Sequence, residues 1–175
     1  CGGTAAPSLT PAPTASIEWV NFTAANFQEL WDGLGTGLFG GSAYAGHFEV
    51  DLLGPISLQA TIFVGPHTKV VFKSSNGRGE LSGLSARRVL IVLGDGASVA
   101  LDGVKVRDGR VSGSRGGCIV VDGFGATLTL DGGAVVSGCE AEGQGDEGYG
   151  GGIFVLGGAE AAITPRSVLK ESSPR

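Results

Sequence analysis

A unit of 29 residues recurs along the middle of this 175-residue chain. Its three clearest copies are TIFVGPHTKVVFKS from Thr61, LIVLGDGASVALDG from Leu90 and IVVDGFGATLTLDG from Ile119. A fourth copy, IFVLGGAEAAIT from Ile153, fits if the turn inside it is about two residues shorter. A register that persists over such an interval is typical of a solenoid, in which each repeat contacts only its neighbours.

Apolar side chains alternate with other residues inside each copy, and equivalent positions align between copies. Two aligned columns are Val70, Val99 and Leu128, and Phe72, Leu101 and Leu130. Alternate residues of a strand point to opposite faces, so each copy presents one apolar face. One unit cannot bury that face alone. We therefore expect the copies to stack in parallel, with neighbouring strands roughly 4.8 Å apart.

Glycine supplies the turns that such a stack requires. The chain has 33 glycines, where average usage gives roughly 12 in this length. The glycines do not follow a Gly-X-Y period, which excludes collagen. A hydrophobic fraction of 42% argues against disorder. The sequence thus predicts an all-β, right-handed parallel β-helix of about four to five coils. An antiparallel sandwich or barrel is the alternative, but it does not predict a constant register.

The texture of the chain predicts four segments. Residues 1–16 are a disordered linker rich in Pro, Thr and Ala. Residues 17–47 form an N-terminal cap with a short amphipathic helix, and residues 48–163 form the coils. Residues 164–175 (TPRSVLKESSPR) are polar and out of register, so we expect a disordered tail. The chain contains no methionine, which indicates a processed form or a fragment.

The helix in the cap is predicted from apolar spacing and flanking residues. We expect Thr23 to cap its start, and Gly33 and Gly35 to end it. Its apolar residues recur at i, i+3, i+4 and i+7: Phe27, Leu30, Trp31 and Leu34. An open end of a solenoid recruits other chains, so a helix of this kind is well placed to cover the first coil.

Three cysteines give no paired framework. Cys1, followed by two glycines and a stretch of Ala, Pro, Ser and Thr, resembles the start of a mature bacterial lipoprotein, whose first cysteine carries the lipid. An arbitrary fragment boundary is the alternative. We expect Cys118 to be a buried thiol beside an apolar strand. A bond between Cys118 and Cys139 is the alternative, although the repeat register does not indicate it.

Charge and missing motifs exclude several classes of function. The net charge is -5, and a nucleic-acid partner would need a basic face. No apolar run is long enough to span a bilayer. His47 and His67 have no partner at metal spacing. The glycine-rich stretches lack the strand–glycine–helix context of a dinucleotide site.

The repeats resemble the pectin-lyase-like right-handed β-helix superfamily over about residues 48–163. More narrowly, they are similar to the repeats of polymorphic outer membrane proteins, whose marker is Gly-Gly-Ala-Ile preceded by Phe-x-x-Asn. Residues 116–119 (GGCI) and 150–153 (GGGI) match the first element, and residues 136–139 (VSGC) take the place of the second without its Phe or Asn. The resemblance implies a surface-exposed or secreted protein, in several members used for adhesion.

The superfamily also contains polysaccharide lyases and hydrolases, so stacked charges are candidate ligand-binding residues. Asp102 and Asp131 are in register, and Lys73 is the equivalent residue one coil earlier. Stacked carboxylates can hold calcium or alter the pKa of one another. The alternative is that each aspartate belongs to a Leu-Asp-Gly corner, where it favours the turn.

Two further groups of charged residues are candidates. An acidic loop between two coils could coordinate calcium through Glu140, Glu142, Asp146 and Glu147. A solvated insertion is the alternative, because the spacing of a known calcium loop is absent. A cluster of arginine and aspartate residues could bind a sugar acid, although an Arg–Asp pair on a protein surface is more often a solvated ion pair. It consists of Arg107, Asp108, Arg110 and Arg115.

We therefore expect a non-catalytic module of an extracellular or surface protein, used for adhesion or structural presentation. Its partners would be a carbohydrate or a cell-surface protein, with no cofactor other than possible calcium. The alternative is a carbohydrate-active β-helix enzyme, which would need carboxylates and a base to converge in one groove.

Overall fold

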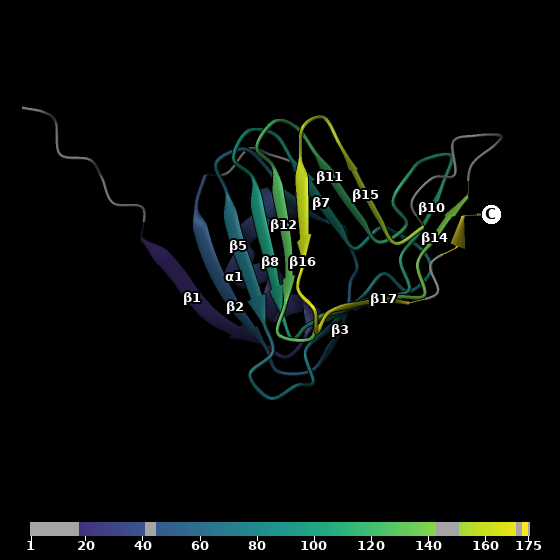
Figure 1. Ribbon diagram of the computed structural model, residues 1–175. Helices are drawn as coiled ribbons and strands as arrows, with labels where there is room; N and C mark the ends of the chain where they lie inside the picture. The colour runs from purple at the N-terminus through teal and green to yellow at the C-terminus, as the bar shows by residue number, and fades with distance from the viewer. Residues whose placement is uncertain (1–17, 41–44, 143–150, 171–172, 175) are drawn as a thin grey trace, which may run out of the picture.

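The computed structural model describes residues 18–40, 45–142, 151–170 and 173–174. Within them every hydrogen-bonded pair of strands is parallel. The strands stack into a solenoid of about five turns (Figure 1). The predicted all-β parallel β-helix is confirmed. No helix in the part of the chain that the structure describes has the length and apolar character to cross a bilayer.

Four sheets, named A to D here, make up the described stack. Sheet A contains β1 (Trp19–Ala24), β2 (His47–Leu52), β5 (Lys69–Lys73), β8 (Ser98–Asp102), β12 (Thr127–Asp131) and β16 (Glu160–Ile163). Sheet B contains β3 (Pro55–Ser57), β6 (Glu80–Ser82), β9 (Lys105–Arg107), β13 (Val135–Ser137) and β17 (Val168–Lys170). Sheet C contains β4 (Ile62–Val64), β7 (Leu90–Leu93), β11 (Ile119–Asp122) and β15 (Ile153–Leu156). Sheet D contains β10 (Arg110–Ser112), β14 (Glu140–Glu142) and β18 (Ser173–Pro174).

The turns of the solenoid are not all alike. The turns made of β2, β3, β4 and of β5, β6, β7 pass from sheet A through sheet B to sheet C. From β8 onward the chain inserts a strand of sheet D between sheets B and C. Sheet D therefore projects from one corner of the later coils only, beside sheet C (Figure 1).

The interior of the stack consists of the aligned apolar columns. Val70 lies opposite Val99, which lies opposite Leu128, and the Phe72 column has the same register. The side chains of both columns are buried. Burying one side chain of this size stabilises a fold by roughly 1.5–3 kcal/mol, so these columns explain why one coil cannot fold alone.

The register within sheet C differs from the sequence alignment by one residue. Leu90 lies opposite Ile62 rather than Thr61. Ile62 is buried, so this register keeps an apolar side chain inside, while the Thr61 hydroxyl donates to the Arg88 carbonyl at 2.8 Å. The difference is absorbed by the turn from sheet C to sheet A, because Lys69 still lies opposite Ser98.

The turn in the fourth copy is one residue shorter, not two. Ile153 lies opposite Ile119, 34 residues away, whereas Glu160 lies opposite Thr127, 33 residues away. Strands stay in register across this change, since hydrogen bonds between neighbouring coils fix the pairing and the corner takes up the missing residue.

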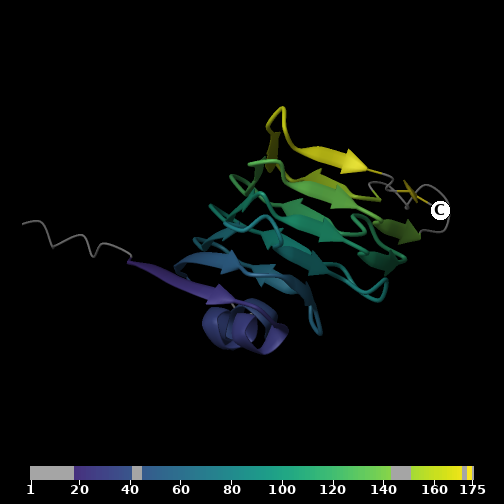
Figure 2. The same ribbon diagram turned by 90° about the horizontal axis from the view of Figure 1, so that it is seen from below.

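Helix α1 (Phe27–Gly40) lies across the first coil as the predicted cap (Figure 2). Its buried residues, Leu30, Leu34 and Leu38, close the apolar interior at that end. Thr23 does not cap the helix, because it belongs to β1. Asn26 does so instead: its Oδ1 accepts from the Glu29 backbone N–H at 3.0 Å, and the Glu29 carboxylate accepts from the Ala25 N–H at 2.7 Å.

The prediction that glycine ends the helix is wrong for Gly33, but the helical backbone does break at Gly35. A side chain at Gly33 would lie about 2 Å from the ring of Phe22, so this glycine permits close packing of the helix on β1. Gly35 has φ of 74° and ψ of 167°, which is not helical, so α1 consists of two helical segments joined by a kink at this residue. Glycine tolerates this conformation where other residues are strained.

Two segment boundaries change. The solenoid begins before residue 48, because β1 is already the first strand of sheet A. The expected disordered tail is wrong for Val168–Lys170, which form β17 and pair with β13. A three-residue strand needs only one inward position, and Leu169 takes it opposite Val136. The linker at residues 1–16, including Cys1, lies outside the described residues.

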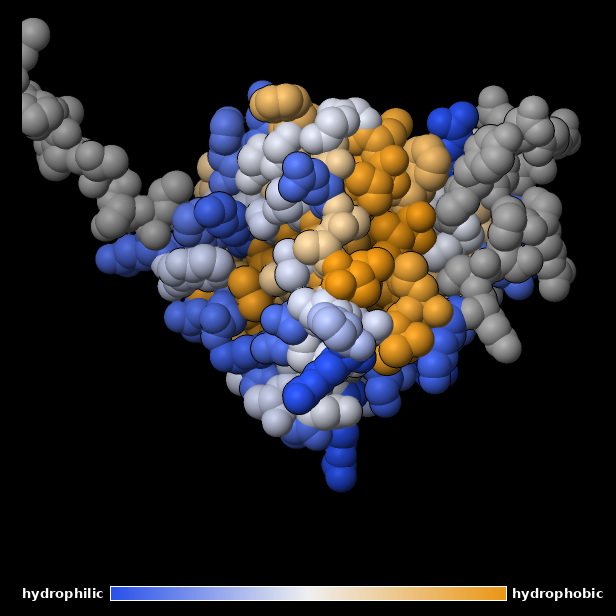
Figure 3. Space-filling model, viewed as in Figure 1, coloured by the Kyte–Doolittle hydropathy of each residue, from blue (hydrophilic) through white to orange (hydrophobic). Residues whose placement is uncertain are grey.

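The last described coil exposes its inward positions. Ile163 and Leu169 continue the interior columns, yet 46% and 49% of their surfaces are exposed. Apolar surface accordingly gathers over this end of the stack (Figure 3). These side chains are exposed because no coil among the described residues stacks on them.

Candidate functional site: an arginine-lined cleft between sheets C and D

The predicted charge column lies in register on sheet A. Lys73 is opposite Asp102, and Asp102 is opposite Asp131. The column extends one coil earlier to Asp51. It runs along the edge where sheet A turns into sheet B, and both later aspartates are exposed. A ligand at these three residues stays a prediction.

The aspartates of this column contact the corners of neighbouring coils. The Asp51 carboxylate accepts from the Ser75 backbone N–H at 3.0 Å and from its hydroxyl at 2.5 Å. Partial burial opposes ionisation, but the bonds from Ser75 and the nearby Lys73 charge leave the pKa of Asp51 below its ordinary value of 3.8. Asp131 accepts from the Gly132 N–H at 2.7 Å and from the Thr164 hydroxyl at 3.1 Å. These contacts fit the interpretation of Asp as a turn residue.

Glu140 and Glu142, the described half of the predicted calcium loop, lie beside one arginine. Glu142 accepts a hydrogen bond from Arg110, and a Glu140 oxygen lies 3.7 Å from Nε of the same guanidinium. This hydrogen bond and charge raise the pKa of Arg110. Asp146 and Glu147 lie outside the described residues. Among the residues that are described, no three potential ligands gather at metal-binding distance.

The structure divides the predicted Arg–Asp cluster among three surfaces. Arg107 pairs with Glu80 at 2.6 Å on sheet B and with Asp108 at 3.5 Å. Arg110 lies on sheet D. Arg115 lies over the ring of Phe154, 5.1 Å from its centroid, on the outer side of sheet C. The four residues therefore do not form one site.

A cleft of about 570 Å³ lies where sheet D meets the corner between β6 and β7. We call it the arginine cleft. Its lining comes from the start of β4, that corner, β10 and β14: Thr61, Ser85, Ala86, Arg87, Arg88, Arg110, Val111, Ser112 and Glu142. None of Lys73, Asp102 and Asp131 lines it. A volume of this size is within the range of small-ligand sites.

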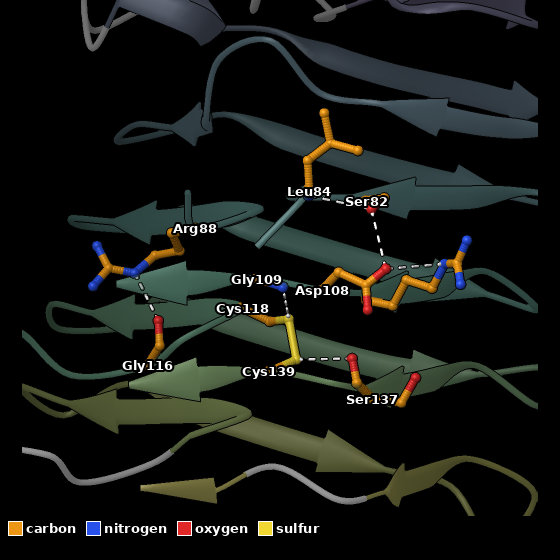
Figure 4. Close-up of a disulfide and its surroundings, with 10 residues drawn as sticks. Ser82, Leu84, Arg88, Asp108, Gly109, Gly116, Cys118, Ser137 and Cys139 are labelled. Atoms are coloured by element: carbon orange, nitrogen blue, oxygen red, sulfur yellow. Dashed lines mark hydrogen bonds and ion pairs between the residues drawn. A yellow bond between two sulfur atoms is a disulfide. The ribbon is translucent and has the colours of Figure 1, made fainter. Parts of the chain in front are cut away.

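The side chains of Arg87 and Arg88 are held at the base of the cleft by hydrogen bonds that they donate to uncharged acceptors. Arg87 Nη1 donates to the Leu58 carbonyl at 2.8 Å. Arg88 donates from Nε to the Gly116 carbonyl at 2.8 Å (Figure 4). Its Nη2 donates to the Ser114 hydroxyl at 3.1 Å and to the Arg115 carbonyl at 2.5 Å. Burial lowers the pKa of Arg88, although a guanidinium stays charged at neutral pH. Within the described residues, neither arginine contacts a carboxylate.

The corner that carries these arginines has an uncommon backbone. Leu84 and Ser85 are consecutive non-glycine residues with φ of 57° and 52°. The Ser85 N–H donates to the Asp108 carbonyl at 2.7 Å, which fixes the corner against the next coil. Such a conformation costs roughly 1–3 kcal/mol per residue and is found at ligand sites more often than elsewhere.

A disulfide that the register did not indicate braces the neighbouring corner. Cys118 precedes β11 and Cys139 precedes β14, and their sulfur atoms are bonded (Figure 4). Both residues are fully buried. The Gly109 N–H donates to the Cys118 sulfur at 3.2 Å, one residue before β10 begins. The expected free thiol is therefore wrong, and the bond ties the root of sheet D to sheet C.

The disulfide was missed because the two cysteines occupy different positions of the repeat. Cys118 leads into sheet C and Cys139 leads into sheet D, 21 residues later. The chain between them passes through sheets C, A and B, so the bond closes nearly one complete turn. The sequence does not show where sheet D leaves the stack, so it does not show that the two corners are adjacent.

Sequence reasoning also missed Arg87 and Arg88. Adjacent arginines in a corner of the repeat, with no acidic residue beside them, were the available signal. Arg110 and Glu142 were singled out, but for different sites. The arrangement places three guanidinium groups and one carboxylate around a cleft in a chain whose net charge is -5. Such a site attracts an anionic ligand.

Comparisons of this sequence with protein-family models, with curated proteins and with solved structures found no match.

Proposed function

We propose that this chain is a non-catalytic binding module of an extracellular or cell-surface protein, used for adhesion. The observation that carries the proposal is the arginine cleft, in which Arg87 and Arg88 line a recess without a carboxylate partner among the described residues. Stacked coils hold these side chains on a rigid support, and rigid support improves binding because less freedom is lost.

The disulfide supports the proposed location. Bonds between cysteines persist in oxidising compartments, such as the periplasm and the cell exterior, and are rare in the cytosol. A buried bond at Cys118 and Cys139 fits a protein that has been exported. Thiol trapping of the native protein should find both cysteines oxidised. Reactive thiols at both positions would contradict the extracellular assignment.

The narrower likeness to polymorphic outer membrane proteins remains part of this proposal. Gly117, in the first matching tetrapeptide, is packed so closely that an added Cβ would lie 2.4 Å from the carbonyl oxygens of Glu140 and Gly151. A small residue is therefore required at this corner, whatever the family. Lys73, Asp102 and Asp131 lie along an edge of sheet A and do not line the arginine cleft, so this placement favours binding over the enzyme alternative.

An array of extracellular proteins and glycans tests the binding function. The labelled chain, with its disulfide intact, is applied beside the Arg87→Gln variant and an Arg78→Gln control at another exposed corner. We expect saturable binding to at least one class of target, at least tenfold weaker for Arg87→Gln and unchanged for the control. Absence of saturable binding by the unmodified chain would refute the adhesion proposal.

A further inference from the structure

The backbone beside the arginine cleft has an open edge. Sheet D is ordered β10, β14, β18, so β10 has a strand neighbour on one side only. Coils before β8 contribute no strand to sheet D among the described residues. An unpaired edge presents N–H and C=O groups at the spacing of a strand.

The hydrogen bonds of β10 show which groups face the cleft. The Glu140 N–H donates to the Gly109 carbonyl, and the Gly113 N–H donates to the Glu142 carbonyl. Alternate residues of a strand bond to opposite neighbours, so Arg110 and Ser112 face away from β14. The Arg110 N–H confirms this direction, because it donates to the Arg87 carbonyl at 3.1 Å. The Arg110 carbonyl and the Ser112 N–H then remain toward the cleft.

The charge beside this edge selects the kind of chain that would pair with it. Arg87 uses one of its five N–H donors in the contact with Leu58. Arg88 also lines the cleft, but its Nε and Nη2 already donate to Gly116, Ser114 and Arg115, so Nη1 is left for a ligand. The Arg110 charge is already matched by Glu142. Val111 and Ala86 add small apolar surface. An added carboxylate can bind Arg87, with Arg88 as a second positive charge that lines the cleft, and it displaces no described ion pair.

We propose that the arginine cleft binds an extended acidic segment of a partner protein, which adds a strand to the open edge of β10. The segment would bond to the Arg110 carbonyl and the Ser112 N–H, with its acidic side chains on Arg87 and Arg88. It would continue along the edge of β10 from the point where the Arg87 carbonyl accepts from the Arg110 N–H, since no strand of an earlier coil pairs with β10 among the described residues. This inference rests on the binding function proposed above and names the class of partner.

An open strand edge favours a peptide over a glycan. Main-chain bonds give affinity in strand addition, and side-chain contacts give specificity. A sugar has no repeating N–H and C=O groups to match the edge. An acidic glycan could still meet the arginines, so the experiment includes one.

The test uses an acetylated octapeptide of alternating glutamate and valine, with a lysine-for-glutamate counterpart. Binding to the oxidised chain is measured by calorimetry. We expect the acidic peptide to bind, and the lysine peptide to bind at least tenfold more weakly. Arg87→Gln should weaken the acidic peptide at least tenfold, and Arg78→Gln should leave it unchanged. Equal affinity for both peptides, or no binding of either, refutes the proposal.

Ser112→Pro tests strand addition separately from charge. Proline removes the N–H that faces the cleft, and it is tolerated on a strand edge whose N–H is not paired. Ser112→Ala is the matched control, because it loses the hydroxyl bond to Glu142 but keeps the N–H. We expect at least tenfold weaker binding for Ser112→Pro only. Methylating alternate peptide nitrogens gives a second measurement that does not depend on folding of the variant.

Tetragalacturonate distinguishes the two ligand classes. Binding of this oligosaccharide that needs Arg87 and is indifferent to Ser112→Pro, together with failure of the octapeptide, assigns the cleft to glycans and overturns the peptide proposal. The adhesion function would survive that outcome, since it requires only saturable binding on the array.

Discussion

Removing the disulfide should weaken the coils that carry the cleft. The bond between Cys118 and Cys139 closes a loop with a sequence separation of 21. Loop-closure entropy for this length is roughly 11 cal/mol/K, or about 3.4 kcal/mol at 25 °C. We therefore expect the Cys118→Ala, Cys139→Ala double variant to lose about 3 kcal/mol in free energy of unfolding.

Urea titration followed by circular dichroism measures the loss, and hydrogen exchange locates it. Protection should fall most in β10 and β14, and least in α1 and β2. The single variant Cys139→Ala is the control, because its remaining Cys118 sulfur can still accept from the Gly109 N–H. It should lose nearly as much as the double variant. A loss below about 1 kcal/mol, or one centred on α1, would refute this account of the bond.

Two corner contacts give further predictions. Gly132→Ala should destabilise the fold by about 1–3 kcal/mol in urea titration, because φ is 60° and the new Cβ would lie 1.8 Å from Asp102 Oδ1. Gly113→Ala isolates the backbone term, since φ is 67° with open space around it, and an equal cost for both variants would contradict the steric part. The lowered pKa of Asp51 stabilises the fold above pH 3.8 and ceases to do so as pH falls through the folded value. Ser75→Ala should therefore lower the melting temperature at pH 7 but not at pH 2, and a constant difference would show that Asp51 ionisation is not involved.

The apolar columns could be predicted because they depend on local alternation. Val99 and Leu101 are two residues apart, and the same pair recurs one coil later at Leu128 and Leu130. Inward positions must be apolar in every coil, so the sequence repeats there. The fold class follows from that constraint alone, and the charged column at the end of sheet A follows from the same register.

The corners could not be predicted in the same way. The shift at Thr61, the capping of α1 by Asn26 and the continuation through Val168 depend on which backbone groups meet at a bend. Those bonds join residues about one coil apart and impose little on side-chain identity. A short strand such as β17 needs only one apolar position. A single position cannot show the alternation of apolar and polar residues by which a strand is predicted.

The candidate site was the least predictable part, because it is made by a change in the repeat. Sheet D starts at β10, and only there do Arg87 and Arg110 face one recess. The copies that start at Thr61, Leu90 and Ile119 keep the same 29-residue spacing whether or not a coil contains a strand of sheet D, so the alignment gives no sign of this strand. The cleft and the disulfide therefore emerge together once the branch point of sheet D is known.

Because of where sheet D lies, substitutions on its surface and substitutions in the apolar interior have different effects. Sheets A, B and C close the apolar interior, whereas sheet D stands at one corner outside that circuit (Figure 1). Substitutions on the exposed sides of β10 and β14 alter what the cleft presents but leave the Val70 and Phe72 columns untouched. The surface of sheet D can therefore change in sequence while the stability of the fold stays nearly constant, because this surface and the apolar columns use different residues.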